Sequence, residues 1–251
     1  MKVRNEEHII EDTLNIWGGI CDGGIHVYDD CSQDGTVEIC KNHSAVAEVV
    51  TSDLFDPDRE RAEWWNRKVV LHSARRFITH TDWICYFDAD EQIEEFDSTL
   101  LDNSECELIS LMCFDPHITE EDKDLPQERY RERKYVGQEF YPLPFFFRNT
   151  LDLDYFYQDQ RLPYVNFEST KQYMGGKLLH WGKGISEEIW ERKCDYYADV
   201  FGPKYSEKWA NRRGKAIHTE SDFGNPLVLW DDILSGKVEP MDRLTGMELV
   251  Q

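Results

Sequence analysis

The sequence predicts an α/β fold with a mostly parallel, Rossmann-like central sheet, and three observations in its first half support this. Short apolar, β-branched segments of strand length alternate with longer segments whose apolar residues recur at helical spacing. Polar turns separate them, and acidic residues follow two of the strand candidates. Such alternation is typical of parallel strands covered by helices. The expected strands are residues 25–28, 46–50, 83–87 and 108–114.

Caps and periodicity predict the helices of the first half. Asn5 is the expected N-cap of a first helix that ends at Gly18–Gly19. Residues 29–36, with the sequence DDCSQDGT, are rich in turn-forming types and join a strand to a helix. Further helices are expected over residues 37–42 and 59–79, the second being the longest in the chain.

The second half is less regular. Residues 115–139 are dense in mixed charge and form either a solvated surface excursion or a mobile lid or acceptor-binding loop. Residues 141–147 carry Pro142 and Pro144, which favour an edge or irregular strand. The remaining expected elements are a strand at 177–181, a helix N-capped by Ser186 that runs to about Phe201, and a helical C-terminal extension, 202–251.

An Asp-x-Asp triplet follows the third expected strand. Asp88 and Asp90 come directly after an uninterrupted apolar run, and in extended chain residues i and i+2 point the same way. Two adjacent carboxylates stay ionised when a cation lies between them, so the pair predicts a divalent-cation site holding phosphates. A solvated acidic turn is the alternative. Three other triplets lack the preceding strand: Asp56/Asp58, Asp122/Asp124 and Asp152/Asp154.

Composition narrows the class of protein. A formal charge of -22 argues against a nucleic-acid partner and against electrostatic adhesion to an anionic membrane. Seven cysteines without metal-site spacing, and no N-terminal signal segment, predict a reducing, cytoplasmic setting. No apolar run is long enough to span a membrane. An acidic protein that binds a polyphosphate needs a cation, which agrees with the prediction for Asp88 and Asp90.

Four segments in this order resemble family 2 glycosyltransferases, which have the GT-A fold. They are RNEE (4–7), VYDDCSQDGT (27–36), FDADE (87–91) and LLHWGKGISEEIWERKCDYY (178–197). The acidic turn with Ser32 to Thr36 is the most specific of them, although Cys31 stands where such enzymes often carry glycine or a small polar residue. The resemblance covers roughly residues 1–200.

The resemblance implies a metal-dependent transfer of a sugar, of hexosyltransferase type, from a nucleotide-diphosphate sugar to an acceptor hydroxyl, with inversion. UDP is the expected nucleotide, and the acceptor would be a glycan or a lipid-linked or protein-linked group. Residues 1–201 would form the GT-A domain, with a nucleotide-sugar-binding half (1–114) and an acceptor-side half (115–201). The extension, 202–251, would pack on the same domain.

The resemblance also implies roles for single residues. Asp30 or Asp29 would accept a hydrogen bond from the nucleobase, with turn capping as the alternative. Mn²⁺ or Mg²⁺ would be held by Asp88, Asp90 and His180. Alternatively, His180 contacts the diphosphate or is a hydrogen-bonded core residue. The other expected nucleotide-binding residues are Val3, Asn5, Glu6, Arg67, Asp88 and Ala89. For Asn5 and Glu6 helix capping is an equal explanation, and for Arg67 a solvated helix cation is the alternative.

An inverting transfer needs a carboxylate base, and the candidates are Asp159, Glu168 and Asp154. Asp159 is preferred because it lies a short distance after the strand that ends near Arg148. A surface turn is an equal explanation for it. Two other classes of function compete with the transferase. A nucleotidyltransferase of similar fold is disfavoured because residues 1–15 contain no glycine, and a non-catalytic nucleotide- or sugar-binding module stays open.

Overall fold

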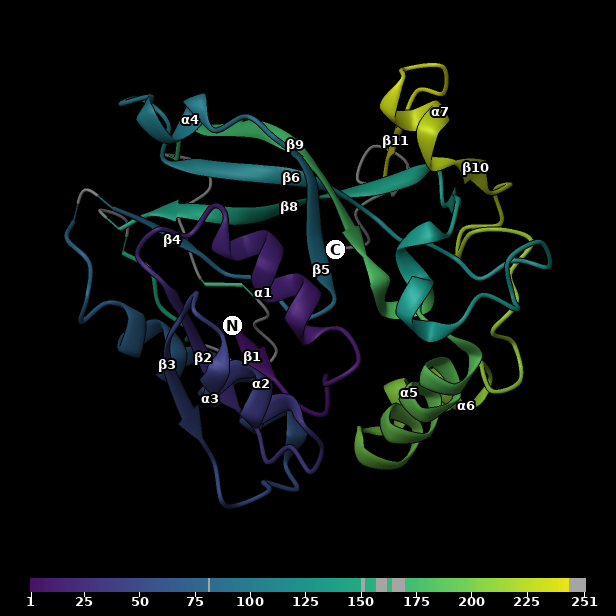
Figure 1. The fold of residues 1–251 in the computed structure, drawn as a ribbon, viewed down its shortest axis with the longest axis horizontal. Helices are drawn as coiled ribbons and strands as arrows, with labels where there is room; N and C mark the ends of the chain where they lie inside the picture. The colour runs from purple at the N-terminus through teal and green to yellow at the C-terminus, as the bar shows by residue number, and fades with distance from the viewer. Residues whose placement is uncertain (81, 150–151, 157–161, 164–169, 244–251) are drawn as a thin grey trace. The chain divides into compact units, whose positions relative to one another are not determined.

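The computed structural model describes residues 1–80, 82–149, 152–156, 162–163 and 170–243 (Figure 1). The chain divides into two compact units. Unit 1 comprises residues 1–111 and 144–176, and unit 2 comprises residues 112–143 and 177–251. Three strands have residues in both units: β6 (Leu108–Phe114), β8 (Glu139–Arg148) and β9 (Gln172–His180).

Unit 1 begins with a three-stranded parallel sheet in the order β1–β2–β3. Residue Val3 of β1 lies opposite Asp29 of β2, and Asp29 lies opposite Thr51 of β3. Helix α3 packs on β1 and β2, and α2 packs on β3. The elements are β1 (Lys2–Val3), α1 (Ile10–Gly18), β2 (Ile25–Asp29), α2 (Thr36–Asn42), β3 (Val46–Thr51) and α3 (Arg59–Ala74). The alternation of strand and helix predicted for this part is confirmed.

The larger sheet corrects the prediction of a mostly parallel sheet, because it is mixed. Its order is β11–β8–β6–β9–β5, and β4 also pairs with β8. Strand β11 (Met241–Asp242) runs parallel to β8, whereas β4 (Trp83–Cys85) runs antiparallel to it. Strand β5 covers Glu91–Phe96, and the short helix α4 covers Thr99–Asp102. The predicted α/β class is therefore confirmed, whereas the predicted mostly parallel strand directions are wrong for this sheet.

Strand β8 pairs with β11 near its start and with β4 near its end, and its proline segment lies between these pairings, which is compatible with the predicted edge or irregular strand. β11 pairs at residues 139–140 and β4 at residues 146–148. Pro142 and Pro144 lie between these two pairings. Proline cannot donate to a β-ladder, and it is accommodated here where the ladder on that side changes partner.

Helix boundaries in unit 1 depart from the prediction at two points. Helix α1 begins at Ile10 rather than after Asn5, and its N-cap Ile9 makes no side-chain cap. Asn5 instead has a left-handed backbone with φ 54°, a conformation that asparagine tolerates better than most residues. Helix α3 ends at Ala74 rather than Thr79, and Asp58 caps its first turn by accepting a hydrogen bond from the amide of Arg61.

The indole of Trp17, in α1, belongs to the buried apolar core of unit 1. Its side chain is fully buried and stacks on Phe87, with ring centroids 4.3 Å apart. Phe145 lies 6.0 Å away on β8. The indole N–H donates to the carbonyl of Glu91 at 2.7 Å, so this large ring is buried with its polar atom satisfied. Trp17 thereby connects the first helix to the segment that follows β4.

Unit 2 contains helix α5 (Glu187–Val200), whose predicted N-cap is confirmed. The Ser186 hydroxyl accepts a hydrogen bond from the amide of Ile189 at 3.2 Å. Trp190 of α5 packs with Ile118 and Ala216 in a small core. The region after residue 201 is not simply helical, because it pairs two short strands with the rest of unit 2. Its elements are α6 (Pro203–Ala210), β10 (Val228–Leu229), α7 (Trp230–Leu234) and β11; the other short elements of unit 2 are η1 (Gln127–Glu132), β7 (Tyr135–Val136) and η2 (Trp181–Lys183).

Among the described residues, no helix has the length and apolar character needed to cross a membrane.

The burial of His117, in unit 2, predicts that the free energy of unfolding depends on pH. It is 1 % exposed, and its ring lies 4.7 Å from that of His218. Burial, followed by the charge of Lys183, lowers the pKa of His117 to about 3. The unfolded chain binds a proton near pH 6.5, and the folded protein does not. The free energy of unfolding is therefore expected to be highest above pH 6.5 and to fall by about 1.4 kcal/mol per pH unit as the pH drops toward 3.

Urea unfolding between pH 5 and 7 measures this slope. His117→Phe should flatten it without abolishing it, because burial also lowers the pKa of His218 and of His26. His80→Gln, at an exposed imidazole, is the control and should leave the slope unchanged. An unchanged slope in His117→Phe would contradict the assignment of this pH dependence to His117.

Candidate functional site

The polar turn after β2 is built by Asp29. This residue is 2 % exposed, and its carboxylate accepts a hydrogen bond from the amide of Ser32, with both oxygens within 3.3 Å. Cys31 has φ 59°, so the chain reverses sharply at this point. Asp29 therefore has the turn-capping role that was the alternative to nucleotide contact.

Residues 5–7 hold the same turn from the other side. The Ser32 hydroxyl accepts from the amide of Asn5 at 2.9 Å, and the Asn5 side-chain carbonyl accepts from the amide of Gln33 at 2.8 Å. The amide of Glu6 donates to the Thr36 hydroxyl at 2.8 Å. Asn5 and Glu6 thus fix the shape of the turn, and the N-cap position of α1 is taken by Ile9. Val3, buried in β1, accepts from the amide of Asp30 at 3.0 Å.

Asp30 is a buried carboxylate paired with cations. It is 2 % exposed, accepts a hydrogen bond from Arg59, and has the Lys2 ammonium 3.6 Å from Oδ2. Burial raises the pKa of Asp30, but the hydrogen bond from Arg59 and the charges of Lys2, Arg59 and Arg4 outweigh burial. The pKa of Asp30 therefore lies below its ordinary value, and the side chain is ionised at neutral pH.

Asp88 and Asp90 lie in a turn between β4 and β5, so the predicted extended geometry is wrong. Strand β4 ends at Cys85, and the amide of Glu91 donates to the carbonyl of Asp88 at 3.2 Å. The Glu91 carboxylate accepts from the amide of Asp88 at 2.8 Å. Ala89 is 3 % exposed, whereas Asp88 and Asp90 are half-buried. The turn leaves both acids partly accessible while their neighbour points into the core.

Helix α1 anchors this acidic turn. The Thr13 hydroxyl donates to the carbonyl of Ala89 at 2.6 Å and accepts from the side chain of Gln92 at 3.0 Å. Trp17 binds the carbonyl of Glu91, as described above. Thr13 and Gln92 are both fully buried, so the backbone of the turn is held by groups that do not exchange with solvent.

A chain of alternating charges links Asp30 to Asp88 within unit 1. It passes from Asp30 to Lys2, to Glu63, to Arg67 and then to Asp88. The Glu63–Arg67 pair is 2.8 Å apart, and the Arg67–Asp88 pair 3.9 Å. The two acidic clusters predicted from sequence therefore belong to one continuous polar network.

Arg67 and Tyr86 hold Asp88 in this network. Arg67 is 9 % exposed, so it is not the solvated helix cation that the sequence allows as an alternative. Its Nε donates to the Tyr86 hydroxyl at 2.7 Å, and that hydroxyl donates to Asp88 Oδ1 at 2.9 Å. The orientation of the Asp88 carboxylate is thus set by a buried arginine through a buried tyrosine.

Sequence reasoning missed several members of this network: Lys2, Arg59, Glu63 and Tyr86. A signal for some of them was present. Arg59, Glu63 and Arg67 recur every four residues with alternating charge, which places them on one face of α3. No local pattern identifies Lys2, because its partner Glu63 is 61 residues away.

The carboxylates of Asp88 and Asp90 are suited to a divalent cation that binds together with a substrate. Among the described residues, no group of three His, Cys, Asp or Glu side chains is placed to hold a metal ion. Mg²⁺ or Mn²⁺ bound to a nucleotide needs only one or two carboxylates, since phosphates and water supply the other oxygens. Asp88 and Asp90, half-buried at one turn, match that requirement.

Of the three candidate bases, the structure describes one. Asp154 accepts a hydrogen bond from Lys68 at 3.0 Å and lies 3.3 Å from the His72 ring. Burial raises the pKa of Asp154, but the hydrogen bond from Lys68 and further hydrogen bonds lower it below the ordinary value. Such a carboxylate is a poor proton acceptor. Asp159 and Glu168 lie outside the described residues.

His180 belongs to unit 2, at the end of β9. Its Nδ1 lies 2.8 Å from Oδ1 of Asp115, and its side chain is 27 % exposed. His180 is therefore hydrogen-bonded, as expected if it were a core residue, but its side chain is not fully buried.

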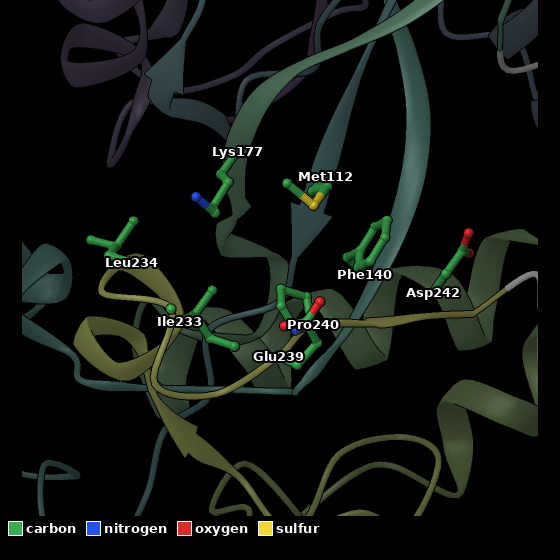
Figure 2. Close-up of a pocket in the computed structure, with 9 residues that line it drawn as sticks. Met112, Phe140, Lys177, Ile233, Leu234, Glu239, Pro240 and Asp242 are labelled. Atoms are coloured by element: carbon green, nitrogen blue, oxygen red, sulfur yellow. The ribbon is translucent and has the colours of Figure 1, made fainter.

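Unit 2 also contains a pocket of about 420 Å³ (Figure 2). Met112, Phe140 and Ile233 contribute apolar surface, and Lys177 and Asp242 contribute charge. Of the residues predicted from sequence to act in binding or catalysis, none that the structure describes lines this pocket.

Comparisons with known proteins give distant structural likenesses. A scan against family models and a search of curated proteins found no match. The chain is similar to the crystal structure of S. aureus TarS 1–349, with 13 % sequence identity and a TM-score of 0.42 over 83 % of this chain and 67 % of that one. It is also similar to TarS 1–349 in complex with UDP, with 13 % identity and a TM-score of 0.39 over 84 % and 69 %. Likenesses at these scores carry no functional argument.

Proposed function

We propose that this protein is a metal-dependent glycosyltransferase that moves a sugar from a nucleotide-diphosphate sugar, with UDP as the nucleotide, to an acceptor hydroxyl. The proposal starts from the resemblance of its sequence motifs to family 2 glycosyltransferases. The observation that supports it best is the continuous network from Asp30 to Asp88. Two motifs 58 residues apart in sequence (88 − 30) thereby share one polar network.

The charges of this network suit a diphosphate only when a cation is present. Asp88 and Asp90 would hold Mn²⁺ or Mg²⁺, which stabilises the negative charge that develops on the leaving diphosphate. Arg67 is the cation that the network places beside these acids, at 3.9 Å from Asp88. Since Tyr86 and Glu63 already orient its guanidinium, Arg67 can offset phosphate charge without reorganisation.

The roles proposed at the nucleobase and the acceptor come from the resemblance of the sequence motifs. Asp30 is 2 % exposed and already accepts from Arg59, so it acts here mainly by holding Arg59 and the turn. Contact between Asp30 and the base stays a prediction. The pairing of Asp154 leaves Asp159 and Glu168 as the better candidates for the base. The acceptor is proposed to be a glycan or a lipid-linked or protein-linked hydroxyl, and the transfer is proposed to invert.

Ligand binding and turnover test the proposal together. UDP with Mn²⁺ should raise the unfolding temperature, because a ligand at a hundred times its Kd adds about 2.7 kcal/mol to the free energy of unfolding. Incubation of UDP-sugars and Mn²⁺ with candidate acceptors should release UDP. Release of pyrophosphate would indicate a nucleotidyltransferase, and UDP binding without turnover would indicate a binding module. No thermal shift with any nucleotide, together with no transfer, would contradict the proposal.

A further inference from the structure

The pocket of about 420 Å³ lies entirely within unit 2, where it separates the larger sheet from helix α7 (Figure 2). Strands β6, β8 and β9 form one wall with Met112, Phe140 and Lys177. The opposite wall is formed by α7, with Ile233 and Leu234, and by the segment that joins α7 to β11. Its volume and its largely apolar walls are those of a site for a small organic molecule.

Hydrogen bonds hold the segment between α7 and β11 in place. The amide of Gly236 donates to the carbonyl of Ile233 at 3.2 Å. The side chain of Gln138 donates to the carbonyl of Glu239 at 2.8 Å, and the carbonyl of Gln138 accepts from the amide of Met241 at 3.1 Å. Because this wall is already ordered, a ligand loses little binding free energy to the ordering of the chain.

The charged groups on the sheet side of the pocket are far apart. The strands are adjacent in the order β11, β8, β6 and β9. Asp242 on β11 and Lys177 on β9 are therefore three strand spacings apart, roughly 14 Å across the sheet. The apolar side chains of Phe140 and Met112 lie between them (Figure 2). The pocket thus has a carboxylate at one end and an ammonium group at the other.

The β11 end of the pocket is acidic. Glu239 lines the pocket three residues before Asp242, and its side chain is exposed. The cations that flank these two acids in the chain have carboxylate partners of their own. Lys237 pairs with Asp232 at 2.9 Å, and Arg243 pairs with Asp115 at 3.1 Å. Two carboxylates against one distant ammonium give the lining a net negative charge.

We propose that this pocket binds an organic cation with an aromatic body, whose ammonium group is held by Glu239 and Asp242. The body lies along Phe140 and Met112, toward Lys177. An aromatic ring at that end attracts both the thioether of Met112 and the ammonium of Lys177. The net charge of -22 also favours a cation over an anion of the same shape. This site is separate from the proposed function and does not depend on it.

Three probes that share one body test the sign of the charge. They are 4-phenylbutylammonium, 4-phenylbutanol and 4-phenylbutyrate, titrated into the protein at pH 7 by calorimetry. The cation should bind about tenfold more tightly than the alcohol, because each of the two accessible carboxylates contributes up to about fivefold. The anion should bind more weakly than the alcohol. Tightest binding of the anion or the alcohol, or no binding of the cation at millimolar concentration, would overturn the inference.

NMR of methionine methyl groups tests the location. The Met112 signal is assigned by its loss in Met112→Leu. The cation should shift this signal and should not shift that of Met174, which lies in unit 1 and is 45 % exposed. Binding that leaves the Met112 signal unchanged would place the cation elsewhere and overturn the inference.

Glu239→Gln should weaken binding of the cation about threefold to fivefold and leave that of the alcohol unchanged. The exposed position of Glu239 makes a loss of fold unexpected. Glu207→Gln, the same change at an exposed residue of α6, is the matched control and should alter neither affinity. An unchanged affinity for the cation in Glu239→Gln would overturn the role of this carboxylate.

Leu234→Trp tests the apolar part of the site. Leu234 is half-buried in the wall of the pocket, so a larger ring there should fill the space and weaken binding of the cation and the alcohol alike. Unchanged binding of both probes in this variant would show that they do not occupy the pocket.

Discussion

Asp90→Asn is expected to lower kcat/KM for Mn²⁺-dependent sugar transfer by about a hundredfold or more. Loss of one preorganised group that stabilises developing charge has effects of about 10²–10³-fold. Asparagine keeps the size of the side chain and removes the charge that the cation requires. The backbone of the turn is held by Thr13 and Trp17, so the substitution should leave the turn in place. Initial rates at several Mn²⁺ concentrations measure the effect.

Asp124→Asn is the matched control for this prediction. Asp124 is exposed and ends another Asp-x-Asp triplet, so the chemical change and the local pattern are the same. Its activity should equal that of the wild type. Urea unfolding of both variants checks that the loss in Asp90→Asn is not a loss of fold. Wild-type kcat/KM in a folded Asp90→Asn would exclude Asp90 as a metal ligand.

Arg59→Met is expected to lower the free energy of unfolding by about 3–5 kcal/mol, the range for removing one partner of a buried ion pair. The Arg59 side chain is 1 % exposed and that of Asp30 is 3 % exposed. Methionine fills much of the same volume but leaves the Asp30 carboxylate buried without its arginine. Urea unfolding at pH 7 measures the loss, and the exposed pair of Arg61 with Asp56 gives the comparison.

Arg61→Met should lower the free energy of unfolding by less than about 1 kcal/mol, because Arg61 is 52 % exposed and solvent screens its pair with Asp56. Asp30→Asn combined with Arg59→Met should recover part of the loss, since no unpaired charge then stays buried. The pKa of Asp30 is lowered in the folded state, so its contribution is present above pH 4 and is lost as the pH falls through the folded pKa. Equal losses of unfolding free energy in Arg59→Met and Arg61→Met would contradict the larger stabilising role of the buried Asp30–Arg59 pair.

Features that depend on residues close together in the chain were predictable from the amino-acid sequence. Strand β6 has its predicted bounds, 108–114, because a continuous apolar run bounded by polar residues indicates a buried strand. The cap at Ser186 is confirmed because a capping hydroxyl and its acceptor amide are three residues apart. The turn at 29–36 is formed by Asx chemistry of the same short range.

Features that depend on residues far apart in the chain required the folded structure. The strand directions of the mixed sheet depend on which segment lies beside β8, and no local pattern encodes that choice. Asp30 and Arg59 are 29 residues apart, and Asp154 and Lys68 are 86 apart. Whether a carboxylate is a free ligand, a base or half of an ion pair depends on such partners. The acids were identifiable from the sequence, whereas their protonation and orientation required the fold.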